Sequence, residues 1–253
     1  MNKDKIFRKV CIMWTFLFLG LLSVQGAKKN TNSFASPDFA FPKKVAANAR
    51  PELDKALKQG NGPDALKALI QVVVAENLVS SGNAAAGVRL IDSVANNLPV
   101  PYSSLAYLLE ARLYKDIYSA KPYIYNGRAI PVEPVPTDIG EWSRDIFSNK
   151  VCGLTEKSFA GLGNHKELPL SSLGTLISNV KEASEAGLTL YDFMTIQSVG
   201  NLRPFSNGIT AEIPFFSGEG KGSKKTEINA TTLIERLLAE NTSWHRNKGK
   251  SLG

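Results

Sequence analysis

The chain is predicted to be mainly α-helical, with helices that pack as antiparallel pairs. Apolar residues recur at three- and four-residue spacing through most of residues 50–203, as they do on the buried face of a helix. Proline and glycine interrupt these stretches at short intervals, so tight turns join consecutive helices and place them side by side. This arrangement is typical of a solenoid of the tetratricopeptide type, although no strict repeat period or repeat signature is present.

Start signals and periodicity define the first helices. Pro51, followed by acidic residues, starts a short helix that ends at Gly60. A stronger helix begins at Pro63, and its apolar face is formed by Leu66, Leu69, Ile70, Val73, Val74 and Leu78. Helices over residues 84–98 and 102–119 follow and are separated by prolines, which cannot continue a helix.

A proline-rich passage over residues 121–136 interrupts this series. Its four prolines exclude a helix, and the apolar triplet at 123–125 is predicted to form a short strand. A start signal at Asp138 then predicts a helix that carries Trp142 and ends near Gly161. Two further helices are predicted over residues 170–180 and 188–202.

The last fifty residues differ in character. Alternating apolar residues predict a loop or small hairpin near 205–220, and residues 218–225 (GEGKGSKK) are typical of a flexible linker. A last amphipathic helix begins near Asn229. The predicted organisation is therefore a signal peptide over 1–27, an extended lead-in over 28–49, a helical domain over 50–203, a loop or hairpin with linker over 204–228, and the truncated start of a further helical segment over 229–253.

The N-terminus has the features of an export signal. Basic residues between Lys3 and Lys9 precede an apolar run over 10–24, and small residues at Gly26 and Ala27 offer a cleavage point. The run is short for a membrane span, so the alternative is an uncleaved signal anchor. Either way, we expect the rest of the chain to leave the cytoplasm.

Charge and cysteine usage narrow the functional class. Of the net charge of +7, the predicted signal peptide holds +3, and the remaining +4 is spread thinly, so nucleic-acid binding is not predicted. Cys11 lies in the predicted signal peptide, which leaves Cys152 without an internal disulfide partner. No cysteine follows the predicted cleavage point, where a lipoprotein would have one. The pattern favours a bacterial periplasm or cell envelope.

No catalytic, cofactor or metal site is predicted. His165 and His245 are far apart in sequence, and Cys152 lies in an apolar helical pattern where a buried thiol is the common outcome. The glycine-rich linker lacks the Ser or Thr that a phosphate-binding loop needs after Lys221. A secreted hydrolase is the weakest hypothesis, because no set of nucleophile, base and orienting residue can be assembled.

One constellation stands out, formed by Arg128, Asp138 and Trp142. We expect Arg128 to pair with a carboxylate or a helix end, and so to hold the proline-rich passage against the helices. The alternative is a partner-docking surface, for which exposed Arg, Tyr and Trp are typical anchors.

Two passages carry a family resemblance. Residues 109–159 contain a spaced series formed by Tyr114, Asp116, Ile117, Tyr118, Arg128, Asp138, Ile139, Trp142, Phe147, Val151 and Ser158. Residues 189–193 (TLYDF) form the second, and a later helix ends in Trp244, His245 and Arg246. Together they resemble the N-terminal region of bacterial alpha-2-macroglobulin-like envelope proteins, in which an exported helical region precedes a series of β-sandwich domains.

The resemblance implies a non-catalytic helical component of a protease-trapping or envelope-defence protein. Its partners would be downstream domains of its own parent or another envelope protein, with no nucleic acid, cofactor or small-molecule substrate, and with membrane contact only through an uncleaved signal. No inhibitory residue is carried over, because Cys152 and Gly153 are followed by Leu154 and not by a thioester signature. The alternative is a stand-alone periplasmic helical-repeat protein that binds a peptide or protein. A fragment should expose apolar residues of its last helix, around Leu233, Leu237 and Leu238.

Overall fold

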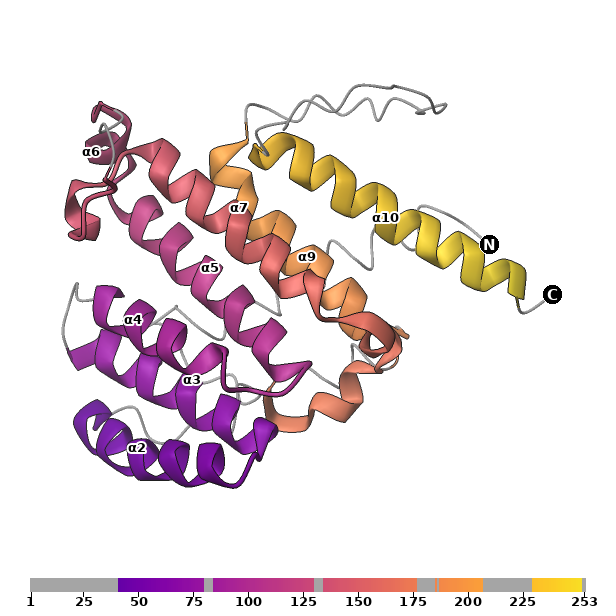
Figure 1. Ribbon diagram of the computed structural model, residues 1–253, viewed down its shortest axis with the longest axis horizontal. Helices are drawn as coiled ribbons and strands as arrows, with labels where there is room; N and C mark the ends of the chain where they lie inside the picture. Colours follow the sequence, from indigo (N-terminus) through magenta and orange to yellow (C-terminus); the bar gives the residue numbers. More distant parts are fainter. Residues whose placement is uncertain are drawn as a thin grey trace, which may run out of the picture. The chain divides into compact units, whose positions relative to one another are not determined.

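The computed structural model describes residues 41–79, 84–129, 134–176, 185, 187–206 and 229–251. These residues are mainly α-helical and pack as helical pairs, which confirms the predicted fold class (Figure 1). They contain no strand, and an isolated antiparallel bridge pairs Pro169 with Thr189. The predicted signal peptide, residues 28–40 of the lead-in and residues 207–228 of the predicted loop or hairpin lie outside the described residues.

The chain divides into two compact units. The first combines residues 1–81 with 164–193, and the second combines residues 82–163 with 194–253. The region predicted as one helical domain over 50–203 therefore contributes to both units. Within the described residues, no helix is long and apolar enough to cross a membrane.

The first unit is built on a pair of helices. α2 (Pro42–Lys58) and α3 (Gly62–Val79) lie side by side (Figure 1). Both helices bury small and branched apolar side chains, which include Ala49, Leu53, Ala56, Ala65, Leu66, Leu69, Val72 and Val73. The unit also contains the short 3-10 helix η3 (Leu170–Leu176), which contacts α3.

The start of α2 differs from the prediction. The helix begins at Pro42 and not at Pro51, so the end of the predicted lead-in is helical. Both prolines carry the same signal, since proline suits a first helical turn where its missing N–H has no partner to lose. The earlier proline begins the helix, and Pro51 lies inside it at an exposed position.

The second unit is organised around α5 (Tyr102–Ala120). α4 (Ala84–Ala95) and α7 (Arg144–Ala160) both pack against α5 (Figure 1). The short α6 (Pro122–Asn126) contacts α5 and α7. α9 (Leu190–Leu202) ends in this unit and leads into the 3-10 turn η4 (Arg203–Phe205).

The last helix of the second unit is α10 (Ala230–Ser251). It packs against η4 and α7 through its first half, where Leu233 and Leu237 are buried while Leu238 is 39% exposed. Two of the three apolar residues expected to be exposed on a fragment are therefore covered by the chain itself. The expectation of an exposed apolar face on the last helix is therefore wrong at Leu233 and Leu237 and holds only at Leu238.

Two predictions for the proline-rich region were wrong. Residues 123–125, predicted as a strand, lie in α6, because Pro122 occupies the first position of that helix, where proline is tolerated. The helix predicted from Asp138 consists of two pieces, the 3-10 turn η1 (Ile139–Glu141) and α7. Trp142 and Ser143 between them have extended backbone angles.

The helix predicted over residues 170–180 is also different in kind. Its described part is the 3-10 helix η3, which is kinked at Gly174 with a φ of 50°. This left-handed conformation is inexpensive for glycine and costly for other residues. The glycine inside the apolar pattern therefore interrupts the helix that its periodicity predicted.

Candidate functional site

Six aromatic side chains form a continuous cluster in the second unit. Phe147 on α7 is fully buried at its centre, and its ring centroid lies 4.8 Å from that of Tyr125 and 5.2 Å from that of Trp142. Trp142 stacks on Tyr114 of α5 with centroids 5.2 Å apart. Tyr118 and Phe205 extend the cluster with a separation of 4.6 Å. Tilted and stacked arrangements of this kind add to the stabilisation from buried area.

Hydrogen bonds fix the polar edges of this aromatic cluster. The indole Nε1 of Trp142 donates to the Pro136 carbonyl at 2.7 Å, and the Tyr118 hydroxyl donates to Asn126 Oδ1 at 2.8 Å. The end of the proline-rich passage is thus held by Trp142. Buried indole and phenol groups generally need such partners, because an unpaired polar atom in the interior is costly.

The three residues singled out in the sequence occupy different settings. Trp142 is buried at 8% exposure, and Asp138 caps η1 by accepting a 2.8 Å hydrogen bond from the Gly140 amide. Arg128 lies over the Tyr125 ring, 5.5 Å from its centroid. Among the described residues, no ion pair or hydrogen bond joins Arg128 to Asp138 or Trp142, so Arg128 meets the aromatic cluster through a cation–π contact.

Sequence reasoning missed a buried carboxylate at the middle of α5. Glu110 is 0% exposed, and neither of its carboxylate oxygens has a hydrogen-bond partner among the described residues. Lys150 of α7 lies beside it, with Nζ 3.5 Å from Oε1. The signal available in the sequence was a single acidic residue within an apolar helical run that includes Leu108, Ala111 and Leu113.

The environment of Glu110 opposes its charged form. Burial raises the pKa of Glu110 to about 7, since loss of water disfavours a carboxylate, and the nearby Asp92 raises it further. Lys150 and, more weakly, Lys157 act in the opposite direction. The result is a carboxyl group that exchanges its proton near neutral pH.

A second polar contact set joins the same three helices. The Tyr107 hydroxyl on α5 donates to Asn96 Oδ1 at 2.5 Å, just beyond the end of α4. Lys157 of α7 donates to the same oxygen at 3.2 Å, and its Nζ lies 4.2 Å from the Tyr107 ring centroid. Asn96 therefore ties α5 and α7 to the end of α4.

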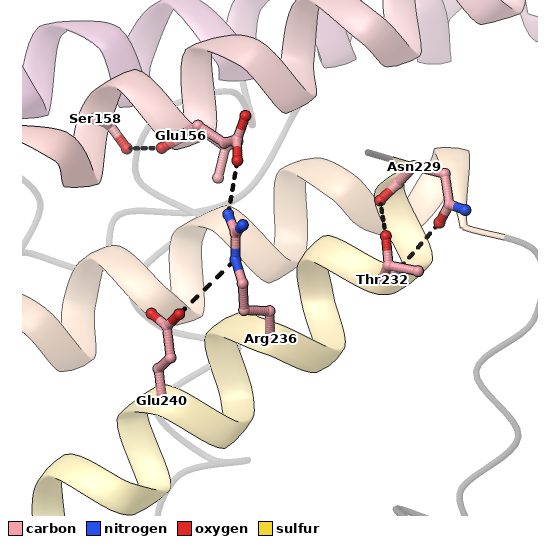
Figure 2. A network of polar contacts seen from close by, with 7 residues as sticks. Glu156, Ser158, Asn229, Thr232, Arg236 and Glu240 are labelled. Atoms are coloured by element: carbon pink, nitrogen blue, oxygen red, sulfur yellow. Dashed lines mark hydrogen bonds and ion pairs between the residues drawn. The ribbon is translucent and has the colours of Figure 1, made fainter. Parts of the chain in front are cut away.

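A surface ion pair connects α10 to α7. Figure 2 shows Arg236 of α10 reaching Glu156 of α7 at 2.8 Å, with Glu240 on its own helix 3.8 Å away. The same view shows Asn229, which caps α10 by accepting a 2.9 Å hydrogen bond from the Thr232 amide. Such partly exposed pairs orient a helix more than they stabilise it.

Cys152 is buried in α7 and has no disulfide partner among the described residues. Burial raises the pKa of its thiol to about 11. Because the thiolate is the nucleophilic form, this cysteine is held in an unreactive state in the native chain. Groups of His, Cys, Asp and Glu that could hold a metal ion do not occur within the described residues.

The second passage of the resemblance forms a helix cap in the first unit. The Asp192 carboxylate accepts from the Thr189 amide at 3.0 Å and from the Thr189 hydroxyl at 2.9 Å. The Asp192 amide in turn faces Thr189 Oγ1 at 3.4 Å. This is the reciprocal arrangement of a capping box, so the TLYDF sequence specifies the start of α9.

In comparisons with known proteins, no family model, no curated protein and no solved structure matches this chain.

Proposed function

We propose that this chain is an exported, non-catalytic helical module, the N-terminal part of an alpha-2-macroglobulin-like envelope protein. In this role it packs on, or positions, the remaining domains of its parent, and the parent traps proteases or defends the cell envelope. The proposal rests on the resemblance of two passages and on the physical role that their residues have in the folded chain.

The aromatic cluster is the observation that carries the proposal. Tyr114, Tyr118, Trp142 and Phe147 come from both sides of the proline-rich passage, and they meet in one packed group. Four of the spaced residues of the resemblance therefore pack together in the second unit. Their chemistry is that of packing, which suits a scaffold.

The second passage supports the same role. Thr189 and Asp192 are both buried and form a helix cap, so they specify the local fold. Cys152, which was considered as a candidate nucleophile, is buried with a raised thiol pKa. These properties favour a scaffold over an enzyme.

The test is the size and location of the native protein in the source cells. An antibody to the second unit is used to blot fractionated cells, and the transcript is sequenced past the codon for Gly253. We expect a band far above 27.5 kDa in the envelope fraction, with a reading frame that continues into β-rich sequence. A band slightly below 27.5 kDa in the periplasm would support the stand-alone helical-repeat protein instead.

A further inference from the structure

Glu110 lies at the middle of the helix around which the second unit is organised. It lies on α5, which contacts α4 and α7. Its carboxylate is excluded from solvent, and neither oxygen receives a hydrogen bond among the described residues. A buried carboxylate without donors is stable as a neutral acid and costly as an anion.

The charged groups around Glu110 are unequally divided between the two neighbouring helices. α7 presents Lys150, 3.5 Å from Oε1, and the more distant Lys157. α4 carries Asp92, which is exposed and whose charge disfavours a charged Glu110, and Arg89, which is also exposed and acts on the neighbouring Tyr114. The described residues of α6 and the second-unit part of α9 contain no charged side chain.

We propose that Glu110 is a proton-operated latch: with a proton on its carboxyl group α4, α5 and α7 pack closely, and without it α4 loosens from α5. The asymmetry of the charges gives the direction of the change. A charged Glu110 attracts Lys150 and so stays attached to α7, while it repels Asp92 and so weakens the contact with α4. This inference does not depend on the proposed function.

The position of Lys150 allows it to follow the proton. Its side chain is 36% exposed, and its Nζ lies 5.4 Å from the centroid of the Tyr114 ring as well as beside Glu110. When Glu110 is neutral, the ammonium group retains the ring and solvent as partners. When Glu110 is charged, the same group becomes its counterion.

The first test is the titration of Glu110 in the folded wild-type chain, followed by the ¹³C shift of its side-chain carboxyl group. The resonance is assigned with Glu110→Gln, and the exposed Glu141 serves as an internal comparison. We expect the Glu110 midpoint near neutral pH, where burial and Asp92 place it. A midpoint in the ordinary range of a glutamate, roughly 4 to 5, would overturn the proposal.

The second test asks which helix loosens. Hydrogen-exchange protection of backbone amides is measured at about pH 5.5 and about pH 8, after correction for intrinsic exchange. For the wild type we expect protection in α4 to fall by about tenfold as pH rises, with a much smaller change in α7. Equal loss in both helices, or no loss in either, would contradict a latch.

Three variants separate the latch from a general packing role. Glu110→Gln, a neutral residue of the same shape, should make α4 protection independent of pH. Asp92→Asn keeps Glu110 buried and removes the repulsion, so the pH-dependent loss in α4 should shrink. The control Glu141→Gln, at an exposed site on η1, should behave as the wild type. A pH-dependent α4 in Glu110→Gln would overturn the assignment.

Discussion

Asp192 in the first unit and Glu110 in the second are both buried carboxylates, yet their surroundings are opposite. Asp192 is 4% exposed and accepts hydrogen bonds from the amide and hydroxyl of Thr189. Glu110 is fully buried and receives none among the described residues. The difference follows from where each residue lies on its helix.

The first turn of a helix has amide groups without an intrahelical partner, whereas in the middle of a helix these amides are already bonded to carbonyls one turn earlier. Asp192 lies in the first turn of α9 and can satisfy the Thr189 amide. Glu110 lies in the middle of α5, where no backbone donor is free. Burial alone does not decide the cost of a carboxylate; access to free donors does.

The helix that carries Glu110 also carries Tyr114 and Tyr118 of the aromatic cluster, whose packing stabilises the second unit. Tyr114, one turn after Glu110, stacks on Trp142. Substitutions in both units test this comparison between a buried carboxylate without hydrogen-bond donors and one that has them.

The largest effect is expected from Trp142→Ala. It removes a buried indole that stacks on Tyr114 and donates to the Pro136 carbonyl, so we expect a loss of roughly 3–5 kcal/mol in the free energy of unfolding. Denaturant unfolding measures this directly. Phe41→Ala, at a side chain that is 64% exposed, is the control and should have little effect. An unchanged melting temperature in Trp142→Ala would contradict a core role and favour the alternative, in which Trp142 belongs to a partner-docking surface.

Glu110→Gln is expected to stabilise the chain at high pH. The folded chain holds the Glu110 proton to about pH 7, while the unfolded chain releases it near 4.5, so the folded state binds more protons between these values. Wild-type stability should therefore fall as pH rises through this window. Glu110→Gln should remove that fall and be more stable by about 3 kcal/mol above it. Parallel pH profiles for the two proteins would contradict the prediction.

Thr189→Ala tests the satisfied carboxylate. The change removes a hydroxyl that donates to the Asp192 carboxylate, whereas the backbone amide of residue 189 can still donate to it. Loss of a helix cap typically costs about 1 kcal/mol, and we expect a loss of about 1–2 kcal/mol because the site is buried. Thermal unfolding measures it. Thr189→Ser keeps the hydroxyl and should recover most of the stability.

Arg236→Ala tests a carboxylate that stays in contact with water. Glu156 is 34% exposed, so solvent replaces much of what the lost ion pair supplied. We expect a loss below about 1 kcal/mol that shrinks further in added salt. Urea unfolding at two salt concentrations is the measurement. A salt-independent loss of several kcal/mol would show that the α10–α7 contact is more than a surface pair.

Periodicity predicted the existence of the longer helices because each needs an apolar face, and α3, α5, α9 and α10 lie close to their predicted ranges. Short elements were harder. The prolines in the passage after α5 argued against a helix there, so α6 was not predicted. The cap at Asp138 starts a 3-10 turn and not the long helix that was expected. The raised pKa of Glu110 was not predicted for a different reason. The charged residues that shift it lie on α4 and α7, and residues so distant in sequence form no local pattern.

Cys152 illustrates how the folding of the second unit controls the reactivity of a side chain. Its thiol is shielded within α7 and stays protonated, so intermolecular disulfide exchange has no nucleophile to use. Unfolding exposes the thiol and restores an ordinary pKa, so in the presence of an added disulfide oxidant two unfolded copies can be joined by thiol–disulfide exchange. The reactivity of this thiol therefore reports on the packing of α7: a thiol reagent should label it slowly in the folded chain and quickly in the unfolded chain.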